Sequence, residues 1–333
     1  MLPTVILADG FSPYVHVSSI DELARLAAGA GLGDSVALVS QPSTSLKAAH
    51  SISNAISIGE AEFSLDQLLD ASPAIANSGV LLLNPSIALD VATLSKLCTV
   101  IEETQTKSVV YLPIALEDGV VSLSVLKPDT LVEHILEKVH WPIACVYVPS
   151  EVFAFSQNQD RATCASGKEL IVRLLISAHS CGISIKSADA TVALRGETEP
   201  DLVCRLDLKD QARALRHAVT VFNIEELFTE YNWSEFENES AAAAFHSLAA
   251  MFLRLDEQES AIECLGMSDD LEDSPRSLAL KAAISFKQGK SLDAVAQLVS
   301  SLQEYEKRKN ATKEHYLSFP PTDIQTLNSS LQK

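Results

Sequence analysis

The sequence predicts an α/β domain followed by an all-α region, and three observations lead to this fold class. Over residues 1–220, apolar runs alternate with amphipathic stretches, which is typical of a mostly parallel sheet flanked by helices. From residue 221 to 316 the strand-like runs stop, and the chain becomes acidic, periodic and rich in alanine. The final segment, 317–333, is polar and contains two adjacent prolines, so we expect a loosely ordered tail there.

Six apolar runs are predicted to be the strands of the first domain. They are Thr4–Ala8, Ser35–Val39, Val80–Leu83, Ser108–Pro113, Ala144–Pro149 and Thr191–Leu194. Helical patterns lie between them, at Ile20–Ala28, Ser45–Ile56, Ser64–Leu69, Ala92–Glu103, Pro128–Val139 and Gly167–Cys181. Residues 120–125 and 202–206 are candidates for additional edge strands.

An internal repeat organises the helical region. Segment 241–265 can be laid over segment 277–299 with a shift of 33 residues, so that Leu253 falls on Phe286 and Ala261 on Ala294. This pattern resembles tetratricopeptide repeats, which are helical hairpins of similar length. Two such copies are fewer than the three or so that a free-standing array needs. The helices therefore either cap the sheet domain or form a surface for a protein partner or for self-association.

Composition restricts the classes of partner. The formal net charge is −19 and the isoelectric point is about 4.8, which disfavours binding to nucleic acid or to anionic membrane surfaces. No apolar stretch is long enough to predict a membrane span, and the N-terminus lacks the pattern of a secretory signal. The six cysteines are scattered without a CxxC pair, which is typical of buried thiols in a reducing compartment. We therefore expect a cytoplasmic protein.

The order of segments in the first domain resembles the family 2 glycosyltransferases, whose nucleotide-sugar-binding domain has the GT-A fold. TVILADG (4–10) is similar to the first strand of that family, and VALVSQPST (36–44) is similar to the second. LLLNPSIALDVATLSKL (81–97) looks like the third, which in a subgroup of the family ends in N-P-D. Segments 143–153 and 167–194 resemble the later acceptor-side strand and the helix that carries the catalytic base.

This resemblance places a donor site at the ends of the second and third strands. The residues it implies are Ser43, Thr44, Asn84, Ser86 and Asp90. In the family, an acid after the third strand binds a divalent cation that neutralises the leaving diphosphate. Here Ser86 stands at that position, and a neutral hydroxyl is a poor ligand for a hard dication. Asp90 is therefore either a helix cap or a displaced metal ligand, and no cofactor is expected unless Asp90 holds a cation.

The position of the catalytic base also lacks the acidic residues that the family has there. The Glu-Asp pair that begins the family's helix is replaced by Gly167-Lys168-Glu169. Glu169 is either a catalytic base with a shifted helix register or an ordinary acid in the first turn of a helix. Acidic residues are also missing after the second strand, where Ser40-Gln41-Pro42 stands.

Together, these departures favour a glycosyltransferase-like protein of glycan or glycoprotein assembly that is catalytically degenerate and acts as a scaffold or partner-binding subunit. The alternative is an active, metal-independent glycosyltransferase with a nucleotide-sugar donor, using Lys168, Arg173 or Arg195 to stabilise the leaving group. A third interpretation is another doubly wound binding domain. No GxGxxG, P-loop or GxSxG motif is present, which disfavours dinucleotide enzymes, P-loop NTPases and ordinary α/β-hydrolases.

Overall fold

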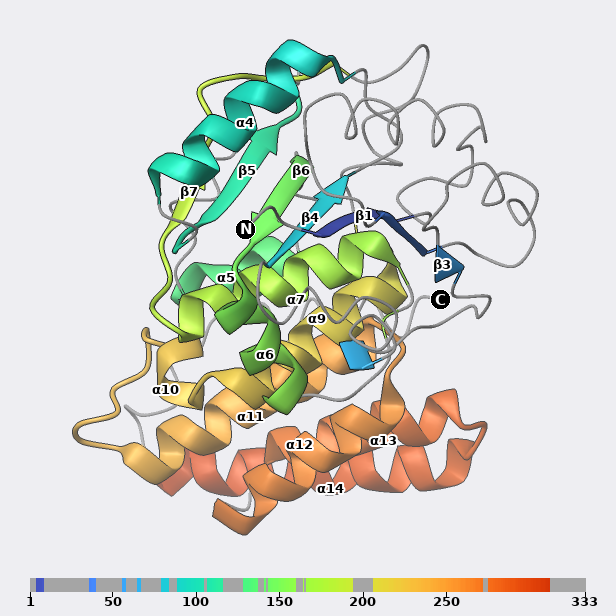
Figure 1. Cartoon of the computed structure of the whole chain (residues 1–333). Coiled ribbons are helices and arrows are strands. Elements are labelled where there is room, and N and C mark those ends of the chain that lie inside the picture. The colour runs from blue at the N-terminus through green and yellow to red at the C-terminus, as the bar shows by residue number, and fades with distance from the viewer. Residues whose placement is uncertain are drawn as a thin grey trace. The chain divides into compact units, whose positions relative to one another are not determined.

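The computed structural model shows a sheet with flanking helices followed by a set of helices (Figure 1). The chain divides into two compact units, Met1–Asn223 and Ile224–Lys333. The residues that the structure describes are 4–8, 36–39, 56–57, 65–66, 79–83, 89–104, 107–115, 128–136, 141, 143–159, 164, 166–193, 206–271 and 275–311.

The described residues of the first unit form one mixed sheet of seven strands in the order β3-β2-β1-β4-β6-β5-β7. Four of the neighbouring pairs are parallel, and the two pairs that involve β6 are antiparallel. The strands are β1 Thr4–Ala8, β2 Val36–Val39, β3 Ile56–Ser57, β4 Val80–Leu83, β5 Val109–Pro113, β6 Ile143–Val148 and β7 Ile185–Ser187.

Strands β4, β5 and β6 form the buried centre of the first unit, because every residue in them is buried. Gly79, just before β4, has φ +73° and lies against β6. A Cβ atom at this position would come within 2.6 Å of the Val148 carbonyl oxygen and 2.8 Å of the Tyr147 hydroxyl. Only glycine therefore allows β4 to enter the sheet at this point.

The sequence located most of these strands. The bounds predicted for β1 and β4 are confirmed, those for β2 and β5 differ by one residue at the first end, and those for β6 differ by one residue at both ends. The strand predicted at Thr191–Leu194 was wrong, because only an isolated bridge between Ile114 and Val192 forms there and the edge strand is β7. The helix predicted over Ser45–Ile56 is also wrong at Ile56, which belongs to β3, and its other residues lie outside the described part of the chain.

Five helices accompany the sheet in the described part of the first unit. They are α4 Val91–Glu103, α5 Pro128–Leu136, α6 Ser150–Gln159, α7 Gly167–Ser180 and α9 Leu208–Val221. The predictions for α4, α5 and α7 are confirmed to within three residues at each end, and α6 and α9 were not predicted. Helix α7 is apolar on almost all sides, and 11 of its 14 residues are buried. It packs against α6 and α9 and is the central helix of this unit.

In the part of the second unit that the structure describes, two helical hairpins follow the short helix α10. Its helices are α10 Ile224–Leu227, α11 Glu237–Arg254, α12 Gln258–Leu271, α13 Pro275–Lys287 and α14 Ser291–Ala311. Helix α11 packs on α12, and α13 packs on α14. Among the described residues, no helix combines the length and the apolar character that crossing a membrane requires.

The two hairpin turns repeat each other at the predicted shift of 33 residues. Asp256 and Gly289 both have positive φ, at 66° and 75°. The Asp256 and Gly289 amides donate to the Leu253 and Phe286 carbonyl oxygens, which are again 33 residues apart. The hairpin period predicted from the sequence is therefore present in the backbone hydrogen bonds.

A lysine from the second hairpin holds the turn of the first. The Lys287 ammonium donates to the Leu253 carbonyl oxygen at 3.0 Å and to the Asp256 carboxylate at 2.8 Å. Leu253 is buried, whereas the equivalent residue of the second hairpin, Phe286, is 51% exposed. The second hairpin therefore covers the end of the first.

A buried histidine links three helices of the second unit. His246 of α11 shares a hydrogen bond with the Ser277 hydroxyl of α13 at 2.6 Å and another with the Ser268 hydroxyl of α12 at 3.1 Å. Ser268 also donates to the Ala242 carbonyl oxygen. Burial lowers the pKa of His246 to about 4, and the positive charge of Arg276 adds to this effect. The histidine is therefore neutral at physiological pH.

Candidate functional site

The sheet topology defines where a ligand site of the predicted kind would lie. Strand β1 pairs with β2 on one side and β4 on the other, both in parallel, so the strand order reverses between β1 and β4. In open α/β sheets such a reversal creates a crevice at the carboxyl ends of the strands. The predicted donor residues Ser43, Thr44, Asn84 and Ser86 follow β2 and β4 but lie outside the described residues, so their role stays a prediction.

Asp90 is the one predicted donor-site residue that the structure describes, and it caps helix α4. Its Oδ1 accepts a hydrogen bond from the Thr93 amide at 2.7 Å, and its own backbone is extended. This hydrogen bond holds the pKa of Asp90 below its usual value. The interpretation of Asp90 as a helix cap is confirmed.

No multidentate metal centre is visible around Asp90 or elsewhere in the described part of the chain. No group of three or more histidine, cysteine, aspartate or glutamate side chains is arranged there to hold an ion. The carboxylate of Asp90 would have to share its oxygens between the helix end and a cation. Asp90 as a displaced ligand therefore remains an untested prediction.

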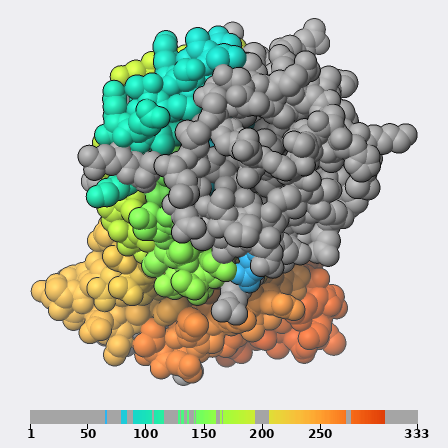
Figure 2. Space-filling model, viewed as in Figure 1, coloured from blue at the N-terminus to red at the C-terminus, as the bar shows by residue number. Residues whose placement is uncertain are grey.

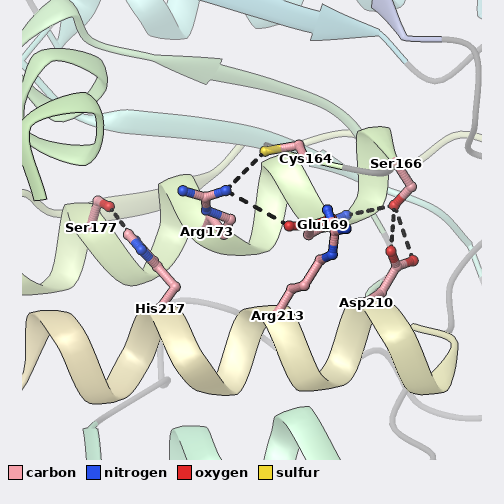
Figure 3. A network of polar contacts seen from close by, with 8 residues as sticks. All are labelled: Cys164, Ser166, Glu169, Arg173, Ser177, Asp210, Arg213 and His217. Atoms are coloured by element: carbon pink, nitrogen blue, oxygen red, sulfur yellow. Dashed lines mark hydrogen bonds and ion pairs between the residues drawn. The ribbon is translucent and has the colours of Figure 1, made fainter. Parts of the chain in front are cut away.

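Glu169 lies in the first turn of α7 but is completely buried. Its side chain has 0% relative exposure, and its two carboxylate oxygens each lie 3.7 Å from a guanidinium nitrogen, one of Arg173 and one of Arg213 (Figure 3). Arg173 is one helical turn further along α7, and Arg213 comes from the neighbouring helix α9. An isolated buried carboxylate is very unfavourable, so the two arginines are what allow Glu169 to stay inside the protein.

Ser166 connects the start of α7 to α9. As the N-cap of α7, its hydroxyl oxygen accepts a hydrogen bond from the Glu169 amide at 3.0 Å. The same hydroxyl lies 3.0 Å from both carboxylate oxygens of Asp210 and donates its proton to that group. One serine thus caps one helix and binds an acid of the other.

Asp210 is a buried acid with a strongly perturbed pKa. It is 2% exposed, and burial is the main cause that raises its pKa to about 6, with the negative charge of Asp207 adding to the shift. The hydrogen bond from Ser166 acts in the opposite direction. Asp207 is itself the N-cap of α9, and its Oδ1 accepts a hydrogen bond from the Asp210 amide at 2.8 Å.

Two further polar contacts continue along the same helix pair. The Arg173 guanidinium donates to the Cys164 sulfur at 3.2 Å, and burial raises the pKa of that thiol to about 12. The thiol therefore stays protonated and is a poor nucleophile. Two turns along α7 from Glu169, the Ser177 hydroxyl and His217 Nε2 lie 2.9 Å apart, and both residues are fully buried.

These side chains form two facing polar stripes, which we call the α7–α9 polar interface. Helix α7 contributes Glu169, Arg173 and Ser177 at intervals of four residues, and α9 contributes Asp210, Arg213 and His217 at intervals of three and four. Figure 3 shows the two sets meeting between the helices. The sequence contained a signal for α7, since these polar residues interrupt an apolar helix at a regular spacing.

The α7–α9 polar interface can hold charge but offers little access to a substrate. Glu169, Arg173, Ser177 and His217 are each 0 or 1% exposed, and Arg213 is the most exposed member, with 18% of its side chain accessible. The two arginines balance the charges of Glu169 and Asp210 when both acids are ionised. Such an arrangement fixes the mutual position of two helices, and it also commits Arg173, a predicted leaving-group cation, to internal partners.

Comparison with known proteins finds no matching protein-family model and no matching curated protein. Two solved structures of residues 1–349 of S. aureus TarS align over 92% of this chain and 92% of their own. The one described as a complex with UDP-GlcNAc has 13% sequence identity and a TM-score of 0.44, and the other has 14% and 0.42. At these values the likeness carries no conclusion about the activity of this chain.

Proposed function

We propose that this chain is a glycosyltransferase-like scaffold whose sheet unit does not transfer sugar and whose helical unit binds a protein partner. The observation that carries the proposal is the state of Glu169, the acid that the resemblance offers as a catalytic base if the helix register is shifted. It is fully buried and lies between two arginines.

A catalytic base has to reach the acceptor hydroxyl directly or through one water molecule. Glu169 would have to leave both arginines and become accessible before it could do so. The departing carboxylate would leave Arg173 buried without its acidic neighbour, which is costly for a residue that is 1% exposed. The geometry thus favours a structural role for Glu169 at the α7–α9 polar interface.

The sequence around the predicted donor site supports the same proposal. The resemblance places a neutral residue, Ser86, where the family has a carboxylate for the cation. Asp90, the nearest acid, is engaged as the cap of α4. Without a hard cation or a substitute for it, the negative charge that develops on a leaving diphosphate is not neutralised.

The proposal is tested by assaying sugar transfer and donor hydrolysis with the full-length chain. The substrates are a panel of nucleotide-sugars, with manganese and with a chelator, and binding is followed in parallel by calorimetry. We expect no turnover above the buffer rate, with binding that is absent or independent of metal. Turnover with a useful rate would contradict the scaffold proposal.

Two variants identify which alternative holds if turnover is found. In the metal-independent enzyme, hydrolysis persists in chelator and is lost in Glu169→Gln. In a metal-dependent enzyme with Asp90 as a ligand, Asp90→Asn abolishes the effect of manganese. Asparagine is a good N-cap, so this substitution keeps α4 intact and serves as its own folding control.

A further inference from the structure

Helix α14 exposes a line of aliphatic side chains, which we call the α14 stripe. It consists of Leu292, Val295, Val299 and Leu302, whose relative exposures are 87%, 59%, 47% and 63%. The orange and red surface in Figure 2 belongs to the helices of this second unit. Single exposed aliphatic residues are common on proteins, but a continuous line of four along one helix marks an interaction surface.

The internal repeat shows that the hairpin fold does not require this stripe. Thirty-three residues earlier, the equivalent positions of α12 are occupied by Glu259, Ile262, Gly266 and Asp269. Three of these four are charged or lack a side chain. Of the two equivalent helices, α14 has the more apolar outer face and α12 the more polar one. The stripe therefore serves something other than the stability of its own hairpin.

The spacing of the α14 stripe specifies a helical partner. Its residues are separated by three, four and three positions, which is the heptad spacing of a seam between two helices. Within the described residues, α14 is the helix that exposes large aliphatic side chains in this pattern. Those of α12, at Ile262, Met267 and Leu271, are separated by five and four positions instead. A second copy of α14 supplies the matching seam.

The charge around the stripe also suits a second copy. Two copies of a chain with a net charge of −19 repel each other, so a contact surface free of like charges is needed to avoid adding short-range repulsion. The positions that flank the stripe on the helix are uncharged: Ser291, Ala296, Leu298 and Gln303. A basic partner, in contrast, would have no acidic residue to pair with at the positions of the stripe or at those that flank it.

We propose that two copies of this chain associate through their α14 stripes, in antiparallel orientation about a two-fold axis. In this arrangement Leu292 of one copy meets Leu302 of the other, and Val295 meets Val299. Antiparallel pairing overlaps only the apolar turns, whereas parallel pairing would place the charged sequence after Gln303 beside its own copy. The inference gives a specific partner to the interaction role proposed for the helical unit and rests on that role, but it requires no nucleotide or sugar.

The size of the stripe sets the expected strength of the dimer. From Leu292 to Leu302 there are 302 − 292 = 10 steps along the helix, or about 15 Å. A seam of this length, one helix wide, buries less area than a standard protein–protein interface, which buries about 1,200–2,000 Å² in total. We therefore expect a concentration-dependent dimer with a Kd on the order of 10–100 µM.

Sedimentation equilibrium of the full-length chain over about 5–300 µM measures this association, because dimerisation depends on protein concentration. Val295→Glu introduces a charge into the centre of the seam and should raise the Kd at least about tenfold. Ile262→Glu is the matched control, since it adds the same charge at the equivalent, similarly exposed position of α12. It should leave the Kd within about twofold of the unchanged chain.

A chain that is monomeric at every concentration would overturn the proposal, as would equal weakening by both substitutions. If the chain is monomeric and Val295→Glu lowers the melting temperature while Ile262→Glu does not, the stripe is covered within one chain and the proposal is wrong. Calorimetry with nucleotide-sugars on the same samples tests the first unit separately. A negative result in one experiment is therefore distinct from a negative result in the other.

Discussion

The two units bury polar groups in opposite ways. The α7–α9 polar interface of the first unit encloses two acids and two arginines that depend on each other's charge. The second unit joins three helices through His246, which is neutral and bonded to two serine hydroxyls. The comparison shows that helices of one chain can be aligned either by compensated charge, which is costly to disturb, or by neutral hydrogen bonds, which are weaker.

The largest effect is expected when one partner of the buried ion pairs is removed. Arg173→Met leaves Glu169 buried beside Arg213 alone, and we expect the free energy of unfolding of the first unit to fall by about 3–5 kcal/mol. Urea denaturation followed by tryptophan fluorescence measures this loss. The double variant Glu169→Met with Arg173→Met should recover most of it, because no uncompensated acid remains there. A loss equal in the single and double variants would contradict the role assigned to charge.

The next effect is a pH response of opposite sign in the two units. The folded-state pKa of Asp210 is raised from 3.8 to about 6, so its contribution to stability is fully present below pH 3.8 and is lost as pH rises through 6. The folded-state pKa of His246 is lowered from 6.5 to about 4, so its contribution is present above pH 6.5 and is lost as pH falls to 4. Each contribution amounts to about 1–3 kcal/mol.

Acidification from pH 6.5 to 4 should thus favour the first unit through Asp210 and destabilise the second through His246. The two tryptophans of the chain can report on the units separately, since Trp141 lies in the first and Trp233 in the second. Thermal melts of Trp233→Phe and Trp141→Phe follow one unit each. Adding Asp210→Asn or His246→Gln should remove the corresponding slope, and slopes that persist in these variants would refute the assignment.

A smaller effect distinguishes charged from neutral hydrogen bonds. Ser166→Ala removes a donor to the Asp210 carboxylate together with the cap of α7, and we expect a loss of about 1.5–3 kcal/mol. Ser277→Ala removes a hydrogen bond to neutral His246 and should cost about 0.5–1.5 kcal/mol. Denaturant titrations at pH 7.5 compare the two. Equal losses would mean that the two clusters do not differ in the way described.

The smallest effect concerns the electrostatic tuning of Asp210. Asp207→Asn keeps an N-cap on α9 but removes the negative charge that raises the pKa of Asp210. The pKa of Asp210 should therefore fall toward its ordinary value, with little change in stability. NMR titration of the Asp210 carboxyl carbon measures the shift, and an unchanged or higher pKa would contradict the stated cause.

The sequence predicted the central strands well because their apolar runs are short and their ends are abrupt. Val80–Leu83 is confirmed without a shift at either end. In contrast, β7 consists of Ile185–Ser187, in which only the isoleucine is buried, so no apolar pattern marked it. The isolated bridge at Val192 lies in the more apolar segment that was predicted to be a strand.

The α7–α9 polar interface could not be predicted as a unit. Its ion pair between Glu169 and Arg213 and its hydrogen bond between Ser166 and Asp210 join residues about forty positions apart. In the sequence, the charges of α9 suggest a solvent-facing side, whereas Asp210 and His217 are buried against α7. Glu169 was correctly placed in a first helical turn, but sequence spacing gives no information on the arginine that reaches it from another helix.

The lysine that holds the first hairpin turn makes that turn chemically different from the second. Lys287 grips the first turn through the carboxylate of Asp256, but the equivalent residue of the second turn is Gly289, which has no carboxylate to offer. A further hairpin packed on the second in the same way would find the Phe286 carbonyl oxygen for its lysine, but no carboxylate beside it. In protein engineering, Gly289→Asp would supply the second turn with the carboxylate that a further hairpin could bind through its lysine.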